Sequence, residues 1–455
     1  MELYCKKELV KINSFFFVAD ATPKLFFLSI KLINHPKINC MKKIYVFSLM
    51  AFIIFSFNSC VKDSCKHTYS YTWFEPLYKT SAEVRANIKS NPARDVKSPG
   101  KLFVIGNFIF LNEINKGVHV INNSNPSAPV NIGFIDIPGN IDIAVKGNTL
   151  YADLYTDLVA LDISNPLNVT KTKIVSNVFP ERYYGFAPDS SKIIYEWVRH
   201  DTTVATDCSP NGWFGGGGML MFSSDVASNK SLVGGSPTGV AGSMARFALM
   251  NNYLYAVGDS KLKVVDIVQV GNPVVVNTVN LGWGIETIYP FKDKLFIGSN
   301  SGMFIFNTTN PSAPVQLSSF SHARVCDPVI ADDNYAYITL RNGTKCQGFL
   351  NELDIVDISN LAAPVLFKKF DMTNPHGLSK DGDLLFICDG KDGLKIFDAK
   401  NLGNLLLKKQ IKNLETYDVI AFNGLAMVVA KDGLYQFDYS DVDNIKQLSK
   451  ISITL

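Results

Sequence analysis

A histidine in the C-terminal third of the chain is the strongest single candidate for catalysis. His376 lies in the segment Met372–Gly377, and Glu286 and Asp327 stand at a corresponding place in two earlier segments. A histidine beside carboxylates can act as a general base near neutral pH. These residues support one hypothesis, a hydrolase or lyase that acts on a polar substrate.

The same residues belong to a set that recurs in strands expected to lie innermost in a ring of repeats. Charged side chains of both signs would meet there, either as a solvated, salt-bridged channel mouth or as a site for a polar ligand. The ligand-binding candidates are Asp142, Arg246, Glu286, Asp327, His376 and Asp418. Their neighbours in the set are Lys101, Tyr184, Thr287, Pro328 and Gly377.

The sequence lacks the spacings that mark the common metal and cofactor sites. It has 6 His and no HxxxH or HExxH pattern, so no metal is predicted. No G-x-S-x-G, Walker or dinucleotide motif occurs. The run Gly215–Gly218 lacks the strand–helix context of a phosphate loop. We therefore expect no cofactor.

A repeated phrase provides the elements that must position these residues. Its clearest form is Leu353–Val365, an apolar strand that ends in Asp and is followed by a turn of Ser, Asn and Pro. Most copies are about 41 residues apart, which is a propeller period. The eight copies begin at Gly117, Asp157, Gly218, Lys261, Gly302, Glu352, Gly393 and Gly433.

Each repeat predicts four antiparallel strands, because turns rich in Asn, Asp, Gly and Pro separate the apolar runs. We expect an all-β propeller of about eight four-stranded blades over residues 94–455. Seven blades is the alternative, if the degenerate third copy is not a blade. The strand pattern Ser191–Tyr195 favours eight. The ring should begin with a strand at Lys101–Ile105, end with one at Lys446–Thr454, and exchange no strand at its seam.

The Asp that ends the phrase invites a metal or acid–base interpretation. It precedes a turn, where a carboxylate accepts backbone N–H bonds, and it recurs in most repeats, so we interpret it as a turn brace. These residues are Asp162, Asp266, Asp357, Asp398 and Asp438.

With its repeats aligned, the chain resembles the LVIVD-repeat family, named for the phrase present here as Leu353–Asp357. The resemblance covers roughly residues 94–455. It implies a β-propeller on the cell envelope, and it implies no established activity.

The N-terminal region resembles a bacterial lipoprotein precursor of the Bacteroidetes type. Met41-Lys42-Lys43 precedes an apolar run that ends before Cys60, which predicts a signal peptide at 41–59 and lipidation of Cys60. We interpret residues 1–40 as a mis-called upstream extension. Residues 60–93 are expected to be a tether with one short helix, because Thr80 and Glu83 have capping-box spacing.

Two insertions are candidate partner surfaces, at 197–217 and 341–351, because they carry aromatic residues on loops. The aromatic candidates are Trp213, Phe214 and Phe349. Packing onto the propeller rim is the alternative. Cys326 and Cys346 flank one hairpin and are a possible disulfide pair.

Charge excludes one class of partner. The chain has 44 basic and 41 acidic residues without a long basic run, so nucleic acid is not an expected partner. The leading hypothesis is a non-enzymatic scaffold, attached to a membrane through Cys60, that binds an envelope protein or a glycan. Its expected location is the cell envelope, as an outer-membrane lipoprotein facing the periplasm or the cell surface. The channel enzyme is the alternative.

Overall fold

The computed structural model describes residues 66–180, 192–207, 240–322, 328–342 and 350–454. These residues fall into two units. The smaller unit comprises, among described residues, 66–69 and 203–207. The larger unit holds the rest, and the sites described below all belong to it.

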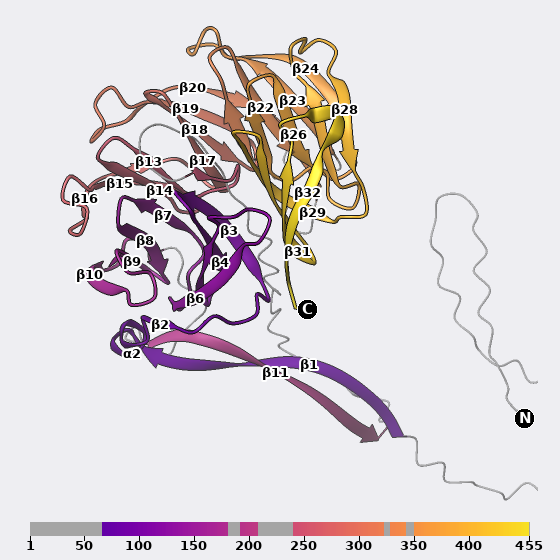
Figure 1. Cartoon of the computed structure of the whole chain (residues 1–455). Helices are drawn as coiled ribbons and strands as arrows, with labels where there is room; N and C mark the ends of the chain where they lie inside the picture. Colours follow the sequence, from indigo (N-terminus) through magenta and orange to yellow (C-terminus); the bar gives the residue numbers. More distant parts are fainter. Residues whose placement is uncertain (1–65, 181–191, 208–239, 323–327, 343–349, 455) are drawn as a thin grey trace, which may run out of the picture. The chain divides into compact units, whose positions relative to one another are not determined.

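The described residues of the larger unit form a β-propeller of seven blades that follow one another in chain order (Figure 1). Blades 1 and 2 contain β3 (Pro99–Ile105), β4 (Phe108–Glu113), β5 (Gly117–Asn122), β6 (Val130–Asp136), β7 (Ile143–Lys146), β8 (Thr149–Leu154), β9 (Asp157–Asp162) and β10 (Thr170–Val175). Blades 3 and 4 contain β13 (Phe247–Met250), β14 (Tyr253–Val257), β15 (Lys261–Asp266), β16 (Val274–Asn280), β17 (Ile285–Phe291), β18 (Lys294–Ser299), β19 (Gly302–Asn307) and β20 (Val315–Ser321).

The remaining blades have the same meander. Blades 5 and 6 contain β21 (Val329–Ala331), β22 (Tyr335–Leu340), β23 (Glu352–Asp357), β24 (Val365–Asp371), β25 (Leu378–Asp381), β26 (Leu384–Cys388), β27 (Leu394–Asp398) and β28 (Leu406–Ile411). Blade 7 contains β29 (Thr416–Phe422), β30 (Leu425–Ala430), β31 (Gly433–Asp438), a 3-10 turn at Val442–Asn444 and β32 (Lys446–Ser452). The first strands of neighbouring blades contact one another, which places them at the centre of the ring.

The expectation of eight blades is wrong, and the alternative of seven is confirmed. Lys192–Asp207 is one long strand, β11, and it pairs with β1 (Lys66–Thr80) in a separate two-stranded sheet. An alternating strand pattern fits a ribbon as well as a blade, so the pattern around Tyr195 did not distinguish them. The third copy of the phrase, at Gly218, lies outside the described residues.

The turn brace predicted for the repeated phrase is confirmed. In each blade that ends its third strand in Asp, a carboxylate oxygen accepts the backbone N–H two residues later. For Asp162, Asp266 and Asp357 this distance is 2.8 Å. Asp398 and Asp438 make the same bond at 3.0 Å and 2.9 Å. These carboxylates therefore shape the turn into the fourth strand.

Tight turns and buried tyrosines explain how the blades form and join. Gly147 and Asn251, each at the tip of a hairpin between first and second strands, have φ of 54°, as such two-residue turns require. Tyr151 and Tyr255 are fully buried, and their hydroxyls donate to carbonyls in the turn of the next blade, each at 2.7 Å. Burial raises the pKa of both phenols, so they remain neutral donors.

The seam between blades 7 and 1 closes without strand exchange in the described chain, as predicted. One parallel bridge joins Val96 to Ile453, and the Thr454 amide donates to the Val96 carbonyl at 2.8 Å. Two short strands extend blade 1. They are β12 (Val240–Ala241), on β3, and β2 (Lys89–Asn91), on β6.

The short helix predicted ahead of the repeats is confirmed as α2 (Ser81–Ala86). The Thr80 hydroxyl accepts from the Glu83 amide, and the Glu83 carboxylate accepts from the Thr80 amide, which completes the capping box. Within the described residues, no helix is both long and apolar enough to span a membrane.

Candidate functional site

The central axis of the propeller is occupied by a piece of its own backbone. Residues 242–246, hereafter the axial segment, link β12 to the first strand of blade 3. The Lys101 ammonium of blade 1 donates a hydrogen bond to the Met244 carbonyl, and the Ile288 amide of blade 4 donates to the Ala245 carbonyl at 2.8 Å. Because a short stretch touches inner strands on opposite sides of the ring, it lies across the axis.

Blades 6 and 7 hold the start of the axial segment. The Ser243 hydroxyl accepts the Leu378 amide at 2.6 Å and faces Asp418 Oδ1 at 3.4 Å. Ser243 and Asp418 are fully buried. A Cβ on Gly242 or on Gly377 would come within 1.9 Å of the Asp418 carboxylate. The carboxylate is therefore enclosed by two glycines that leave space for it.

Asp142 of blade 2 holds the end of the axial segment. Its Oδ2 accepts the Arg246 amide and, at 3.2 Å, the Phe247 amide, and its Oδ1 accepts the Ile143 amide at 2.7 Å. Burial raises the pKa of Asp142, and the charge of Lys101 and the backbone donors oppose this rise. The carboxylate fixes the backbone that enters blade 3.

His376 is placed where proton transfer at neutral pH is difficult. Burial, together with the charge of Arg341, lowers the pKa of His376 to about 3, so the ring is neutral. Its Nε2 lies 3.1 Å from Asn374 Nδ2, and its edge faces the Tyr417 ring. In the described part of the chain, Nδ1 has no hydrogen-bond partner. Such a histidine is a weak base, which argues against the general-base role.

The other predicted axial residues divide between described and undescribed parts of the chain. Arg246 pairs with Asp259 at 3.1 Å on the same blade. The charge of Glu286 acts on Arg341, whose pKa burial lowers. The structure thus brings Arg341 and His376 together, with Glu286 acting on that arginine.

Binding of a ligand by the axial set stays a prediction. Asp327, Tyr184, Trp213, Phe214, Phe349, Cys60, Cys326 and Cys346 lie outside the described residues.

A second acidic residue in the phrase, Asp354 on β23, has an unusual environment. It is almost completely buried beside Glu352, and Lys369 bridges the two carboxylates at 2.5 Å and 3.4 Å. Burial and the Glu352 charge raise the pKa of Asp354 to about 6. Since the folded protein holds this proton more tightly than the unfolded chain, ionisation of Asp354 costs stability as pH rises from about 4 through 6.

Substitution Asp354→Asn is therefore expected to raise the melting temperature relative to wild type at pH 7. The gain should shrink as pH falls toward 4, because wild-type Asp354 is then protonated as well. Thermal unfolding followed by circular dichroism between pH 4 and 8 measures the difference. A gain that did not change with pH would contradict the assigned titration.

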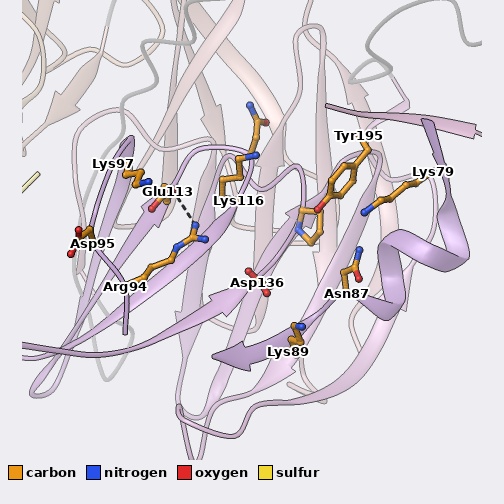
Figure 2. A pocket seen from close by; sticks show the side chains of 12 residues that line it. Lys79, Asn87, Lys89, Arg94, Asp95, Lys97, Glu113, Lys116, Asp136 and Tyr195 are labelled. Carbon is orange, nitrogen blue, oxygen red and sulfur yellow. Dashed lines mark hydrogen bonds and ion pairs between the residues drawn. The ribbon is translucent and has the colours of Figure 1, made fainter. Parts of the chain in front are cut away.

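A hollow beside blade 1 has a volume of about 680 Å³. Figure 2 shows charged side chains from the N-terminal segment and blade 1 around it, with Tyr195 of β11 on one side. We name it the basic hollow. Its cations are Lys79, Lys89, Arg94, Lys97 and Lys116, its carboxylates are Asp95, Glu113 and Asp136, and Tyr195 forms one wall.

Local contacts hold the walls of the basic hollow in place. Arg85 of α2 pairs with Asp157 of blade 2 at 2.6 Å, which fixes the helix. Arg94 lies over the Phe134 ring and pairs with Glu113 at 3.1 Å. Burial alone would raise the pKa of Glu113, but its hydrogen bond with His119 and the Arg94 charge lower it. Glu113 is therefore ionised and committed to its partners.

Sequence reasoning did not identify this hollow. Its walls come from residues as far apart as Lys79 and Tyr195, and residues 60–93 were expected to be a tether with one short helix. Pairing of β2 with β6 brings the N-terminal segment onto blade 1. The available signal was the group of cations at 89, 94 and 97, which precede the first blade.

Comparison with known proteins identifies the repeats. The LVIVD repeat matches residues 98–136, 140–175, 241–280 and 324–372, which correspond to blades 1, 2, 3 and 5. No match was found among curated proteins.

One solved structure of low sequence identity supports the fold alone. A Lactobacillus plantarum protein has 12% identity and a TM-score of 0.50, over 78% of this chain and 97% of that one. The designed protein Ika8 has 10% identity and a TM-score of 0.47, over 79% and 88%. BamB from Moraxella catarrhalis has 9% identity and a TM-score of 0.43, over 82% and 97%.

Proposed function

We propose that this protein is a lipid-anchored binding scaffold of the cell envelope, whose propeller presents a surface to an envelope protein or glycan. One observation carries the proposal. The axis is crossed by the axial segment, whereas the hollow beside blade 1 is open and lined by charged side chains (Figure 2). The binding surface is then the hollow beside blade 1 rather than the central channel.

The attachment to a membrane rests on the sequence. Met41-Lys42-Lys43, the apolar run and Cys60 have the order of a lipoprotein signal. In the mature protein, lipidation of Cys60 would leave five residues before β1 begins at Lys66. An extended chain spans at most about 3.6 Å per residue, so the start of β1 would stay within roughly 20 Å of the anchor.

The experiment compares retention of envelope material by wild type and by two matched variants. Purified full-length protein is immobilised and exposed to a detergent extract of envelopes. We expect Lys97→Gln with Lys116→Gln to lose most of the material that wild type retains, and His376→Gln to retain it. A loss confined to the His376 variant would instead favour the channel enzyme.

Two controls complete the experiment. The exposed pair Lys368→Gln with Lys408→Gln removes the same charge elsewhere and should retain what wild type retains. Cys60→Ser should move the protein from the membrane fraction to the soluble fraction. A Cys60→Ser protein that stayed in the membrane fraction would contradict the lipid anchor, and it would leave the binding result unaffected.

A further inference from the structure

The cations of the basic hollow differ in how far they are already neutralised. In the part of the chain that the structure describes, the ammonium groups of Lys89 and Lys97 have no ion-pair partner. Lys116 faces Glu196 at 3.4 Å, in a pair whose side chains are about half exposed. An ion pair this exposed contributes little to stability. Three ammonium groups are therefore available to an anionic ligand.

The carboxylates of the hollow are interspersed among these cations. Asp95 is exposed, and Asp136 accepts from the Asn91 side chain at 2.6 Å with one oxygen. Figure 2 shows the Asp136 carboxylate near the middle of the hollow, between Arg94 and Asn87. A ligand that is negatively charged along its whole length would be repelled at Asp95 and Asp136. A ligand that alternates carboxylates with hydroxyl donors would bind both kinds of group.

Size and wall chemistry point to the same class of ligand. A volume of about 680 Å³ is in the range of about 300–1,000 Å³ for small-molecule sites. Tyr195 and Pro138 add apolar surface to the polar lining. The Tyr195 ring is held by Lys79, whose ammonium lies 3.4 Å from the ring centre. A sugar ring has both hydroxyls and C–H faces, so it matches these walls.

We infer that the basic hollow binds an acidic oligosaccharide, in which carboxylates meet Lys89, Lys97 and Lys116 while hydroxyls donate to Asp95 and Asp136. The inference rests on the proposed binding function and specifies its ligand class. An acidic peptide is the competing ligand. It has the carboxylates, but its donors are backbone N–H groups and not hydroxyls spread around a ring.

The test uses three probes of similar size with the full-length protein in detergent, measured by isothermal titration calorimetry. The probes are trigalacturonate, maltotriose and an N-acetylated, C-amidated triglutamate. Trigalacturonate and this triglutamate have the same number of carboxylates, and maltotriose has hydroxyls without charge. We expect trigalacturonate to bind at least tenfold more tightly than either of the others, and its affinity to fall as salt is raised.

Variants assign the binding to the hollow. Lys97→Gln with Lys116→Gln should weaken trigalacturonate binding by about tenfold or more, because two charge-assisted hydrogen bonds are lost. Asp136→Asn should weaken the binding of trigalacturonate and strengthen the binding of triglutamate. A merely structural effect would not change the two affinities in opposite directions. The Lys368→Gln with Lys408→Gln control should bind like wild type, and circular dichroism confirms folding of each variant.

Three results would overturn the inference. They are the absence of trigalacturonate binding, equal or tighter binding of triglutamate, and unchanged affinity in the Lys97 and Lys116 variant. Each is distinct from failure of the scaffold proposal, which would appear as wild type retaining no envelope material at all. If envelope material is retained but trigalacturonate is not bound, the scaffold proposal stands and the ligand class is wrong.

Discussion

Replacement of Asp142 by alanine is expected to destabilise the propeller by about 3–5 kcal/mol, the cost of breaking a buried charged network. Asp142 accepts the amides of Arg246, Phe247 and Ile143, and it offsets the charge of buried Lys101. Without it, buried N–H groups lose their acceptor, and the buried Lys101 ammonium loses a nearby opposite charge. The measurement is urea unfolding followed by intrinsic fluorescence.

Two further variants isolate the cause of this effect. Asp142→Asn keeps an acceptor oxygen and should be less damaging than alanine, although the charge opposite Lys101 is lost. Asp371→Ala removes an exposed aspartate at the end of β24 and should change stability by less than about 0.5 kcal/mol. A loss below about 1 kcal/mol in Asp142→Ala would show that Asp142 does not hold the axial segment.

The sequence predicted the blades because their signals are local and repeated. An apolar strand, an Asp brace and a Pro-containing turn recur at nearly constant spacing, and each blade is specified by its own residues. The same regularity identified Asp142 and Asp418 as inner-strand residues. Their environment was not predictable in this way, because the groups that surround them come from the axial segment.

The axial segment itself has no pattern that reveals its position. Gly242 and Ser243 are small and polar, which is typical of a surface turn as well as of a backbone that packs closely against others. The basic hollow was hidden for a related reason. It depends on the pairing of β2 with β6 and of β11 with β1, and both pairings join residues far apart in the sequence. A strand pattern predicts that a strand forms, but it does not predict which strand it pairs with.

A test of the close approach at the axis is Gly377→Ala, which should destabilise the protein by about 1–3 kcal/mol, as overpacking of a core does. The new Cβ would lie 1.9 Å from Asp418 Oδ1 and 3.0 Å from the Asp418 Cα. Gly242→Ala makes the matching contact with Oδ2, also at 1.9 Å. Chemical denaturation of the two single variants and the double variant measures these effects.

A double-mutant cycle with Asp418→Ala shows whether the contact is direct. If the carboxylate is what the Cβ meets, Gly377→Ala should cost less in the Asp418→Ala background, with a coupling of about 0.5–3 kcal/mol. Gly271→Ala is the matched control, because its Cβ would be 3.6 Å from the nearest atom, in Thr172. Strictly additive losses at 377 and 418 would mean that the glycine is needed for backbone reasons. In that case the Asp418 carboxylate would not be the group that the new Cβ meets, because removing that carboxylate would have to relieve a clash with it.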